Sequence, residues 1–469
     1  MERKLFSKVI MTMTAAAVMG LASCSNENVP MGGDLTPQGE PTSMKLVLDL
    51  SGGAYSRAIQ DDNATEEEKK IKNLNVYIYD ANGIFEKEHE IPFDQLIDDG
   101  ENKYVTAKQL DATTGQKTIY VGANMTDAMK QIMKANSVQA LAKKGVGAAL
   151  TEITDNNGFV MFSTTAAGNT LKALDANQPN QLPAENQVTV TLQRLAAKIA
   201  VGMSANTQDI QKGAAGTIDE LGFLVDNINK MYYLTYGGVN GGNTPAATDA
   251  NMFVKDYHKN NFEFAAWDNT PEFKNITPNN ANKAIWNTAY AAENLTADKV
   301  IEGVTRIVVK GQFTPKSGIK VDGNAGQRTF TETDGHIANG ANYYMFNLPE
   351  AGGYAFFNEV DATDEILKEW LASIGITDQG KQNEAIAAKV LYTKGMNYWW
   401  ITVNDNRGDI TRNKFYRADI TSIWAPGRND GKFDDIKDNN VVVDEETNIT
   451  VKITVEPWTL KEFNAELRP

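Results

Sequence analysis

The chain has 469 residues, which is more than one ordinary hydrophobic core needs and enough for two domains of about 150–200 residues. It contains 45 Lys and Arg residues against 60 Asp and Glu residues, which gives a formal net charge of -15 at pH 7. This acidic surplus argues against nucleic acid and anionic membrane surfaces as partners.

The N-terminus, residues 1–23, has the pattern of an export signal, which is not part of the folded protein. Basic residues precede an apolar run, 9–21, that is too short to span a bilayer. The run ends in Leu-Ala-Ser before Cys24, which resembles the lipobox of bacterial lipoproteins, where the cysteine thiol accepts the lipid. An ordinary signal peptide with a chance cysteine is the alternative. Cys24 is the only cysteine, so core burial without internal disulfides must hold the exported protein together.

A flexible tether and a first strand follow the signal. Residues 26–42 are rich in Gly, Pro and Asn, a composition typical of a tether. The next stretch predicts a half-buried strand, because apolar side chains occupy every second position and Val47 is the only exception. The apolar face carries Met44, Leu46, Leu48 and Leu50.

The loop after this strand contains an Arg-Ala bond, Arg57–Ala58, which precedes an acidic tract. Glycines at 52–53 make the loop accessible, so an arginine-specific protease could cut there and release the strand. From the residues alone, a solvated loop arginine is the better interpretation of Arg57. A second such pair, Arg417–Ala418, lies inside a predicted strand and is expected to be protected.

The rest of the first half predicts more strands and two short helices. The strands are at 74–79 (before a turn at 80–83), 104–107, 118–123 and 159–163, and the helices, with Thr or Ser N-caps, are at 126–135 and 137–150. Residues 187–201 predict one long strand whose apolar phase shifts. We therefore expect a β-bulge near Gln193–Arg194 and a domain boundary at this strand.

The second half repeats the pattern of short strands between turn-rich loops. Its strands are predicted at 221–225, 231–236, 305–314, 343–348, 397–403 and 415–423, and its helices at 364–373 (with Thr363 as N-cap) and 381–392. The whole pattern predicts a mostly β protein with a few helical insertions. We expect two β-sandwich domains in tandem, at 58–194 and 195–469.

The C-terminal stretch alternates apolar and polar residues up to Pro457. Its apolar face carries Ile449, Val451, Ile453 and Val455, and Trp458 and Leu460 follow the proline. A strand at the end of the chain that is apolar on one face is free to leave its own subunit. On pattern alone, an ordinary edge strand of the second domain is an equal alternative.

The sequence offers no credible catalytic site. The pair His89-Glu90 lacks the second histidine of a zinc protease, and no G-x-S-x-G nucleophile motif is present. The aspartates at 430, 434, 435 and 438 do not match Ca²⁺-loop spacing and indicate a solvated acidic loop. For Tyr398-Trp399-Trp400, core packing is favoured over an exposed Trp that stacks on a sugar. We predict no enzyme activity, no metal and no cofactor.

Several segments together resemble the fimbrillin family, the major fimbrial (stalk) subunits of type V pili of Gram-negative bacteria. They are the lipobox at Cys24, the strand Leu46–Leu50, the loop ending in Arg57–Ala58, LNVYIYDANG (74–83), QRLAAKIAV (193–201), LGFLVDNINKMYYL (221–234), TRNKFYRADITSI (411–423) and VKITVEPW (451–458).

The resemblance implies transthyretin-like Greek-key sandwiches and an assembly route. A lipoprotein precursor reaches the outer membrane, and an arginine-specific protease cuts between Arg57 and Ala58. The lipidated propeptide, 24–57, then leaves with the removable strand residues Leu46, Leu48 and Leu50. The C-terminal strand of another copy fills the groove by donor-strand exchange, and its donor residues are Ile449, Val451, Ile453, Val455, Trp458 and Leu460.

Two other functions remain beside the stalk subunit. The first is a tip or adhesin subunit, which accepts a strand and need not donate one. The second is a glycan-binding surface lipoprotein that stays monomeric, so it neither accepts nor donates a strand. The long alternating C-terminus favours the stalk. The expected partners are other copies of the chain, other pilus subunits and the protease, with a host receptor or glycan as an adhesion target.

Overall fold

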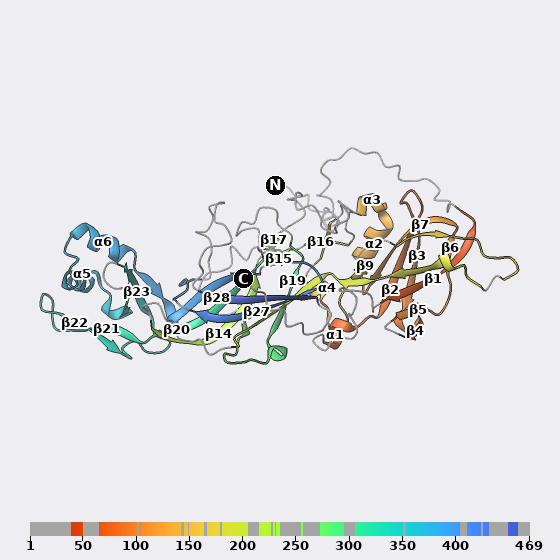
Figure 1. Cartoon of the computed structure of the whole chain (residues 1–469). Coiled ribbons are helices and arrows are strands. Elements are labelled where there is room, and N and C mark those ends of the chain that lie inside the picture. Colours follow the sequence, from red (N-terminus) through yellow and green to blue (C-terminus); the bar gives the residue numbers. More distant parts are fainter. Residues whose placement is uncertain are drawn as a thin grey trace, which may run out of the picture. The chain divides into compact units, whose positions relative to one another are not determined.

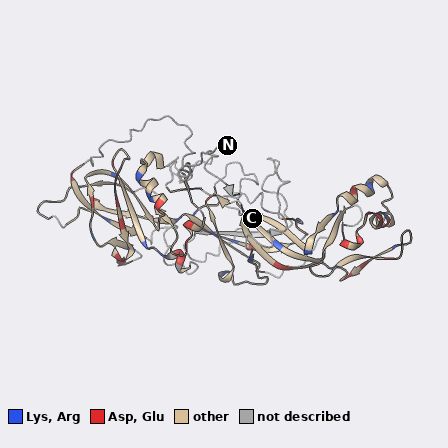
Figure 2. Cartoon of the chain, turned by 180° about the vertical axis from the view of Figure 1, so that it is seen from behind, with Lys and Arg blue, Asp and Glu red and all other residues tan. Residues whose placement is uncertain are grey.

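Figure 1 shows the computed structural model of the chain, whose described residues all lie within Gln38–Pro469. They are 39–49, 65–100, 103–141, 145–148, 150–163, 167–178, 181–204, 215–226, 228–229, 231–234, 255–256, 273–294, 305–349, 353–403, 410–423, 425–430 and 449–457. In the view of Figure 2, acidic and basic residues are interspersed along the described strands and helices.

The first half forms a sandwich of two sheets. One sheet has the order β11-β1-β5-β4, with β6 also paired to β1, and the other has the order β12-β9-β7-β2-β3, with β10 paired to β7. The strands are β1 (Pro41–Asp49), β2 (Asn73–Tyr79), β3 (Phe85–Pro92), β4 (Leu96–Gly100), β5 (Lys103–Thr106), β6 (Leu110–Thr113), β7 (Gly115–Ala123), β9 (Met161–Ser163), β10 (Ala167–Leu171), β11 (Gln187–Val190) and β12 (Leu192–Arg194). Buried side chains of both sheets, such as Leu46 and Val76, form one core.

The second half forms another sandwich, with sheets ordered β19-β13-β27-β28 and β18-β14-β20-β26. Its strands are β13 (Ala196–Gly202), β14 (Gly216–Asp226), β18 (Lys274–Asn275), β19 (Thr288–Ala292), β20 (Arg306–Pro315), β26 (Met396–Thr402), β27 (Lys414–Ile423) and β28 (Ile449–Pro457). Ile199 and Ile420 of one sheet share a core with Val309 and Trp399 of the other.

The remaining elements are short sheets and helices. They are α1 (Glu66–Lys69), α2 (Asp127–Ala135), α3 (Val138–Leu141), β8 (Gly145–Gly147), α4 (Leu150–Ile153), β15 (Ile228–Asn229), β16 (Met231–Tyr233), β17 (Lys255–Asp256), β21 (Ser317–Asp322), β22 (Thr329–Asp334), β23 (Tyr343–Leu348), β24 (Gly353–Asn358), α5 (Asp364–Ser373), α6 (Gln379–Ala387) and β25 (Val390–Tyr392). Trp370 of α5 packs on Phe346 and Phe357 of the sheet β24-β23-β25. None of the helices in the described part of the chain has the length and apolar character to cross a membrane.

The predicted class, mostly β with two sandwiches and a few helices, is confirmed. So are the helices at 126–135 and 364–373 with their predicted N-caps, because Thr126 and Thr363 each accept a backbone N–H three residues on. The prediction of one helix over 137–150 is wrong, since α3 and α4 are separated by β8, which pairs with β16. The helix predicted over 381–392 is α6, which begins at Gln379 and ends before β25.

The predicted single strand over 187–201, with a bulge, is also wrong. The segment is three strands in three sheets, β11, β12 and β13. Val188 and Leu192 lie in the first core, Leu195 lies in a buried cluster that also contains Tyr77 and Phe415, and Ile199 lies in the second core. The phase shift therefore marks the passage of the chain between sheets. The proposed domain boundary at this segment stays a prediction.

Candidate functional site

β1 is a central strand, because it pairs with neighbours on both sides. It runs parallel to β11, with Leu46 opposite Val188 and Leu48 opposite Val190. On its other side it runs antiparallel to β6 through Pro41–Met44 and to β5 through Val47–Asp49. Without β1, the backbone edges of these three strands would be unpaired and would form a template for another strand.

One face of β1 lies in the first core. Met44, Leu46 and Leu48 are 0% exposed, and Lys45 and Val47 on the other face are partly exposed, as the alternation predicted. Burying each such side chain contributes about 1.5–3 kcal/mol, as an upper bound. We call the space that β1 fills between β11 and the pair β5 and β6 the β1 slot.

The end of the β1 slot nearest the N-terminus of β1 is polar, and its side chains Thr42 and Asn186 are buried. Asn186, 0% exposed, donates from Nδ2 to the Ser43 carbonyl at 2.7 Å, to the Lys172 carbonyl at 3.0 Å and to Thr42 Oγ1 at 3.3 Å. Its Oδ1 accepts the Lys172 backbone N–H at 2.8 Å. The Thr42 hydroxyl donates to the Lys172 carbonyl at 2.6 Å. The Thr42 hydroxyl therefore adds two hydrogen bonds to Asn186 and the Lys172 carbonyl, which also bond to each other.

Several residues of the predicted lipidation and cleavage steps lie outside the described residues. They are the lipidation residue Cys24, the strand residue Leu50 and the cleavage pair Arg57–Ala58. Lipidation and cleavage therefore stay predictions. The other Arg-Ala pair is described. Ala418 is 0% exposed and Arg417 is 7% exposed in β27, between β13 and β28, so the predicted protection is confirmed.

The C-terminal strand β28 is an edge strand on its own subunit. Its backbone pairs antiparallel with β27, from Ile449 opposite Ile423 to Pro457 opposite Lys414. This answers a question that the sequence leaves open, namely whether this strand docks on its own body. The backbone is described for the segment holding Ile449, Val451, Ile453 and Val455, whereas Trp458 and Leu460 lie outside the described residues. Their role as donors stays a prediction.

A buried polar cluster that the sequence analysis missed surrounds Glu68 in α1, shortly after the predicted cleavage site. Thr65 and Glu68 form a capping box, with Glu68 Oε2 accepting the Thr65 backbone N–H at 2.9 Å. The Glu68 carboxylate, 0% exposed, pairs with Lys198 Nζ at 2.9 Å and accepts the Tyr290 hydroxyl at 2.5 Å. Arg194 Nε donates to the Glu68 carbonyl at 2.9 Å.

This Glu68 cluster ties the segment after the predicted cleavage site to β12, β13 and β19. Burial, and secondly the charge of Glu68, raises the pKa of Tyr290 well above its ordinary value, so the phenol stays protonated and can donate. The only local signal in the sequence is the capping-box pattern Thr-x-x-Glu at 65–68. The partners lie more than a hundred residues away, which local patterns do not reveal.

The aromatic run at 398–400 is part of the core. Tyr398, Trp399 and Trp400 are 3%, 1% and 6% exposed. Trp399 lies in the second core, and Tyr398 contacts the cluster of Leu224 and Val308. The predicted core packing is confirmed, and none of the three rings is available to stack on a sugar.

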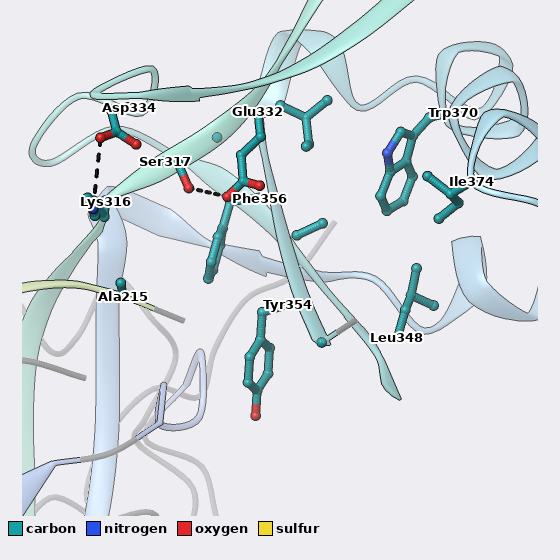
Figure 3. A pocket seen from close by; sticks show the side chains of 14 residues that line it. Ala215, Lys316, Ser317, Glu332, Asp334, Leu348, Tyr354, Phe356, Trp370 and Ile374 are labelled. Atoms are coloured by element: carbon teal, nitrogen blue, oxygen red, sulfur yellow. Dashed lines mark hydrogen bonds and ion pairs between the residues drawn. The ribbon is translucent and has the colours of Figure 1, made fainter. Parts of the chain in front are cut away.

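A pocket of about 410 Å³ lies between β21, β24 and α5 (Figure 3). β21 pairs with β22 and β24 pairs with β23, and no ladder in the described part of the chain joins β21 to β24. Backbone edges therefore border the pocket. Its apolar lining includes Leu348, Tyr354, Phe356, Trp370 and Ile374.

The polar groups of the pocket lie along β21 and β22. Ser317 Oγ donates to Glu332 at 2.5 Å, and Lys316 Nζ lies 3.9 Å from Asp334 (Figure 3). The Lys316 and Asp334 side chains are 65% and 75% exposed, so they form an open rim. A rim of carboxylates above aromatic rings suits a small polar ligand with an apolar face.

The acidic loop predicted around 429–440 is described only up to Asp430, whose Oδ1 lies 3.9 Å from Arg428 Nε. In the described ranges, no three His, Cys, Asp or Glu side chains are placed to hold a metal ion together.

Two family models match the chain. Residues 42–194 match the major fimbrial subunit protein (FimA), and residues 390–464 match the C-terminal part of the major fimbrial subunit protein type IV, fimbrillin. The first match includes β1 with all its pairing partners, and the second includes β27 and β28. No curated protein matches the sequence.

Solved structures with some likeness are bacterial adhesion and fimbrial proteins. A candidate cell adhesion protein from Bacteroides eggerthii is 16% identical, with 91% of this chain and 98% of that chain covered and a TM-score of 0.47. The tip fimbrial protein Mfa3 from Porphyromonas gingivalis, with a C-terminal truncation, is 14% identical, with 89% and 100% covered and a TM-score of 0.39. At these TM-scores the likeness adds no argument to that of the family models.

The family models cover the central strand of the first sandwich and the edge strand of the second, which hold two of the segments that carry the resemblance in the sequence. Over these two segments the chain is similar to the major fimbrial subunit families, which supports a subunit of a cell-surface fimbria that assembles with other pilus subunits.

Proposed function

We propose that the chain is a stalk subunit, which is exported as a lipoprotein and polymerises by donor-strand exchange after β1 is cut away. The observation that carries this proposal is the position of β1. It is fully buried on one face, paired on both sides, and followed in the sequence by a loop with a glycine pair and Arg57–Ala58. A strand in this position leaves a defined and strongly apolar acceptor when it is displaced.

The C-terminal strand fits the acceptor in length and pattern. Its four apolar residues are Ile449, Val451, Ile453 and Val455. Burial of each contributes up to about 1.5–3 kcal/mol, and each backbone hydrogen bond adds about 0.5–1.5 kcal/mol. These gains oppose the cost of association, about 4–15 kcal/mol, and replace the pairing with β27 that the strand gives up. Donor and acceptor surfaces differ, so the contact does not close on itself and filaments follow.

Cys24 supplies the lipid anchor of the precursor in this proposal. Several acyl chains on one cysteine hold a protein at a membrane more firmly than a single chain does. The cut after Arg57 breaks the covalent link between the anchor and the subunit, so displacement of β1 by the incoming strand then frees the protein from the membrane.

The test is proteolysis of the purified precursor with an arginine-specific protease, followed by electron microscopy and gels of unheated and heated samples. Fibres and heat-resistant ladders are expected. The Arg57→Lys protein keeps the positive charge but resists the protease, so it should remain a folded, lipid-anchored monomer. Deletion of residues 444–469 should abolish the ladders and leave cleavage intact. Abundant polymer from Arg57→Lys would refute the cleavage step, and cleavage without ladders would favour a tip subunit.

The pocket between β21 and β24 favours glycan binding as a second candidate function. The Tyr354 ring and the Glu332 and Asp334 carboxylates are of the types that bind the face and the hydroxyls of a sugar. Saturation-transfer NMR with neutral sugars tests this directly. Tyr354→Ala and Glu332→Gln should each remove the signal. The control Lys320→Gln, which changes a residue outside the pocket lining, should keep it. This result would support glycan binding. No signal from any neutral sugar would exclude it.

A further inference from the structure

The buried polar end of the β1 slot differs in kind from the rest of the slot. Met44, Leu46 and Leu48 fill the slot with apolar side chains, whereas Thr42 fills its end with a hydroxyl that makes two hydrogen bonds. We propose that Asn186 fixes the direction and register of the incoming strand, by selecting the alignment that puts Thr447 of another copy where Thr42 lies. This inference rests on the proposed function and goes beyond it.

The hydrogen bonds explain why a side chain is selected here. The Ser43 carbonyl, which accepts from Asn186 Nδ2, is a backbone group that any strand supplies. The Thr42 hydroxyl, which accepts from Asn186 and donates to the Lys172 carbonyl, is a side-chain group that only some residues supply. Thr42 is 6% exposed and Asn186 is 0% exposed, so water cannot readily replace the hydroxyl. An apolar residue at this position would lose both hydrogen bonds of the hydroxyl, and the Lys172 carbonyl would keep only the bond from Asn186.

In the direction of β1, one alignment satisfies both ends of the slot. With Thr447 at the position of Thr42, the residues Ile449, Val451 and Ile453 take the positions of Met44, Leu46 and Leu48. A shift of two residues puts either Ile449 or Glu445 at the position of Thr42, and a shift of one residue puts the polar face of the strand into the core.

The opposite direction fails at the same end of the slot. With the apolar face inward, the residue at the position of Thr42 is Val455 or Pro457, which has no hydroxyl. A further shift brings Thr459 to this position but puts Pro457 at the position of Met44, inside a strand that is paired on both sides. Proline there cannot donate to the ladder. Only the β1-like direction with Thr447 remains.

The substitution test uses full-length protein cut with the arginine-specific protease. Thr447→Val keeps the shape and removes the hydroxyl, and Thr450→Val is the matched control on the opposite face. Thr447→Val should shorten the lifetime of the polymer contact in heated detergent by about 2- to 13-fold, the range for the net loss of one hydrogen bond. Thr450→Val should leave it unchanged.

A disulfide test measures the register itself. The mature subunit from Ala58 onward has no cysteine, so introduced pairs are unambiguous. Lys45 lies opposite Gln187, and Thr450 takes the place of Lys45 in the inferred alignment. Thr450→Cys with Gln187→Cys should cross-link neighbouring copies, whereas Lys452→Cys with Gln187→Cys should not, because two residues along a strand add about 6–7 Å.

The outcomes separate the two proposals. Polymer that cross-links through the cysteine at 452 and has wild-type lifetime with Thr447→Val overturns the register inference and leaves donor-strand exchange in place. Absence of polymer from the cleaved wild-type protein overturns both. Cross-linking at 450 together with the shortened lifetime supports the inference.

Discussion

Replacing Leu48 by alanine should destabilise the uncleaved precursor and leave the polymer made from it unchanged. Leu48 is 0% exposed and lies in β1 between β11 and β5. If β1 is a removable part, its core contacts exist in the precursor only. A substitution in an ordinary core strand would weaken both forms alike.

The size of the effect follows from the packing. A buried Leu→Ala substitution costs about 2–5 kcal/mol, and the upper part of this range applies where neighbours cannot collapse into the cavity. Backbone ladders fix β1 on both sides, so collapse at Leu48 is restricted. Val47→Ala is the matched control, because Val47 is the adjacent residue of β1 and is partly exposed on the other face.

Urea unfolding of the two variant precursors measures the predicted loss of stability. The urea concentration at the unfolding midpoint should fall for Leu48→Ala and stay nearly constant for Val47→Ala. Heating of the polymers in detergent measures the second half. A Leu48→Ala polymer that dissociates more readily than the wild-type polymer would show that β1 remains in the assembled subunit, which contradicts the exchange.

Two further predictions concern the body of the subunit. Glu68→Gln and Lys198→Met should each lower the free energy of unfolding by about 3–5 kcal/mol, because each leaves one charge of a buried pair alone, and the double substitution should recover most of this loss in urea unfolding. Burial lowers the pKa of His89 despite its hydrogen bond to the Asp111 carbonyl, so the unfolded chain binds this proton more readily. Stability should therefore be complete above about pH 6.5 and fall as the pH decreases through the lower folded pKa, and His89→Gln should remove this decline in thermal melts.

Local periodicity was sufficient for the elements that bury one face. Alternation alone predicted β1, and the strands 343–348 and 415–423 were found within a residue of their observed ends. The helices at 126–135 and 364–373 were predicted because a Thr cap and an apolar stripe coincide. These features depend only on residues that are close in the sequence, so they can be predicted without knowledge of tertiary contacts.

Tertiary pairing decides the elements that the sequence did not reveal. β3, with the sequence FEKEHEIP, has mostly charged residues and is a strand because it pairs with β2 along its whole length. β8 holds two glycines in three residues and is held by β16. No local pattern favours a strand in either segment.

The candidate site shows the same division. The apolar face of β1 was predicted, but its position between β11 and β5 depends on strands that lie far away in the chain. Asn186 is one residue before β11, and nothing near it in the sequence indicates that Thr42 and Ser43 are its partners. The polar end of the slot could be found only from the fold.

The central position of β1 also bears on how the exchange is driven. After a cut at Arg57, β1 is no longer tethered to the body, but Met44, Leu46 and Leu48 remain buried and both ladders remain paired. We therefore expect displacement by the incoming strand, one residue after another, with no empty intermediate.

Displacement needs a donor that binds better than β1, and the two apolar faces are similar in size. The difference is length, because β1 runs into Gly52–Gly53 whereas the donor continues with Trp458 and Leu460. Truncation after Pro457 should therefore slow polymerisation and leave much of the cleaved protein as monomer with β1 still bound. Gel filtration and mass spectrometry of the retained propeptide measure this. If the truncated chain polymerised as fast as the full chain, the added length would not be what drives exchange, and the advantage would have to lie within residues 447–457.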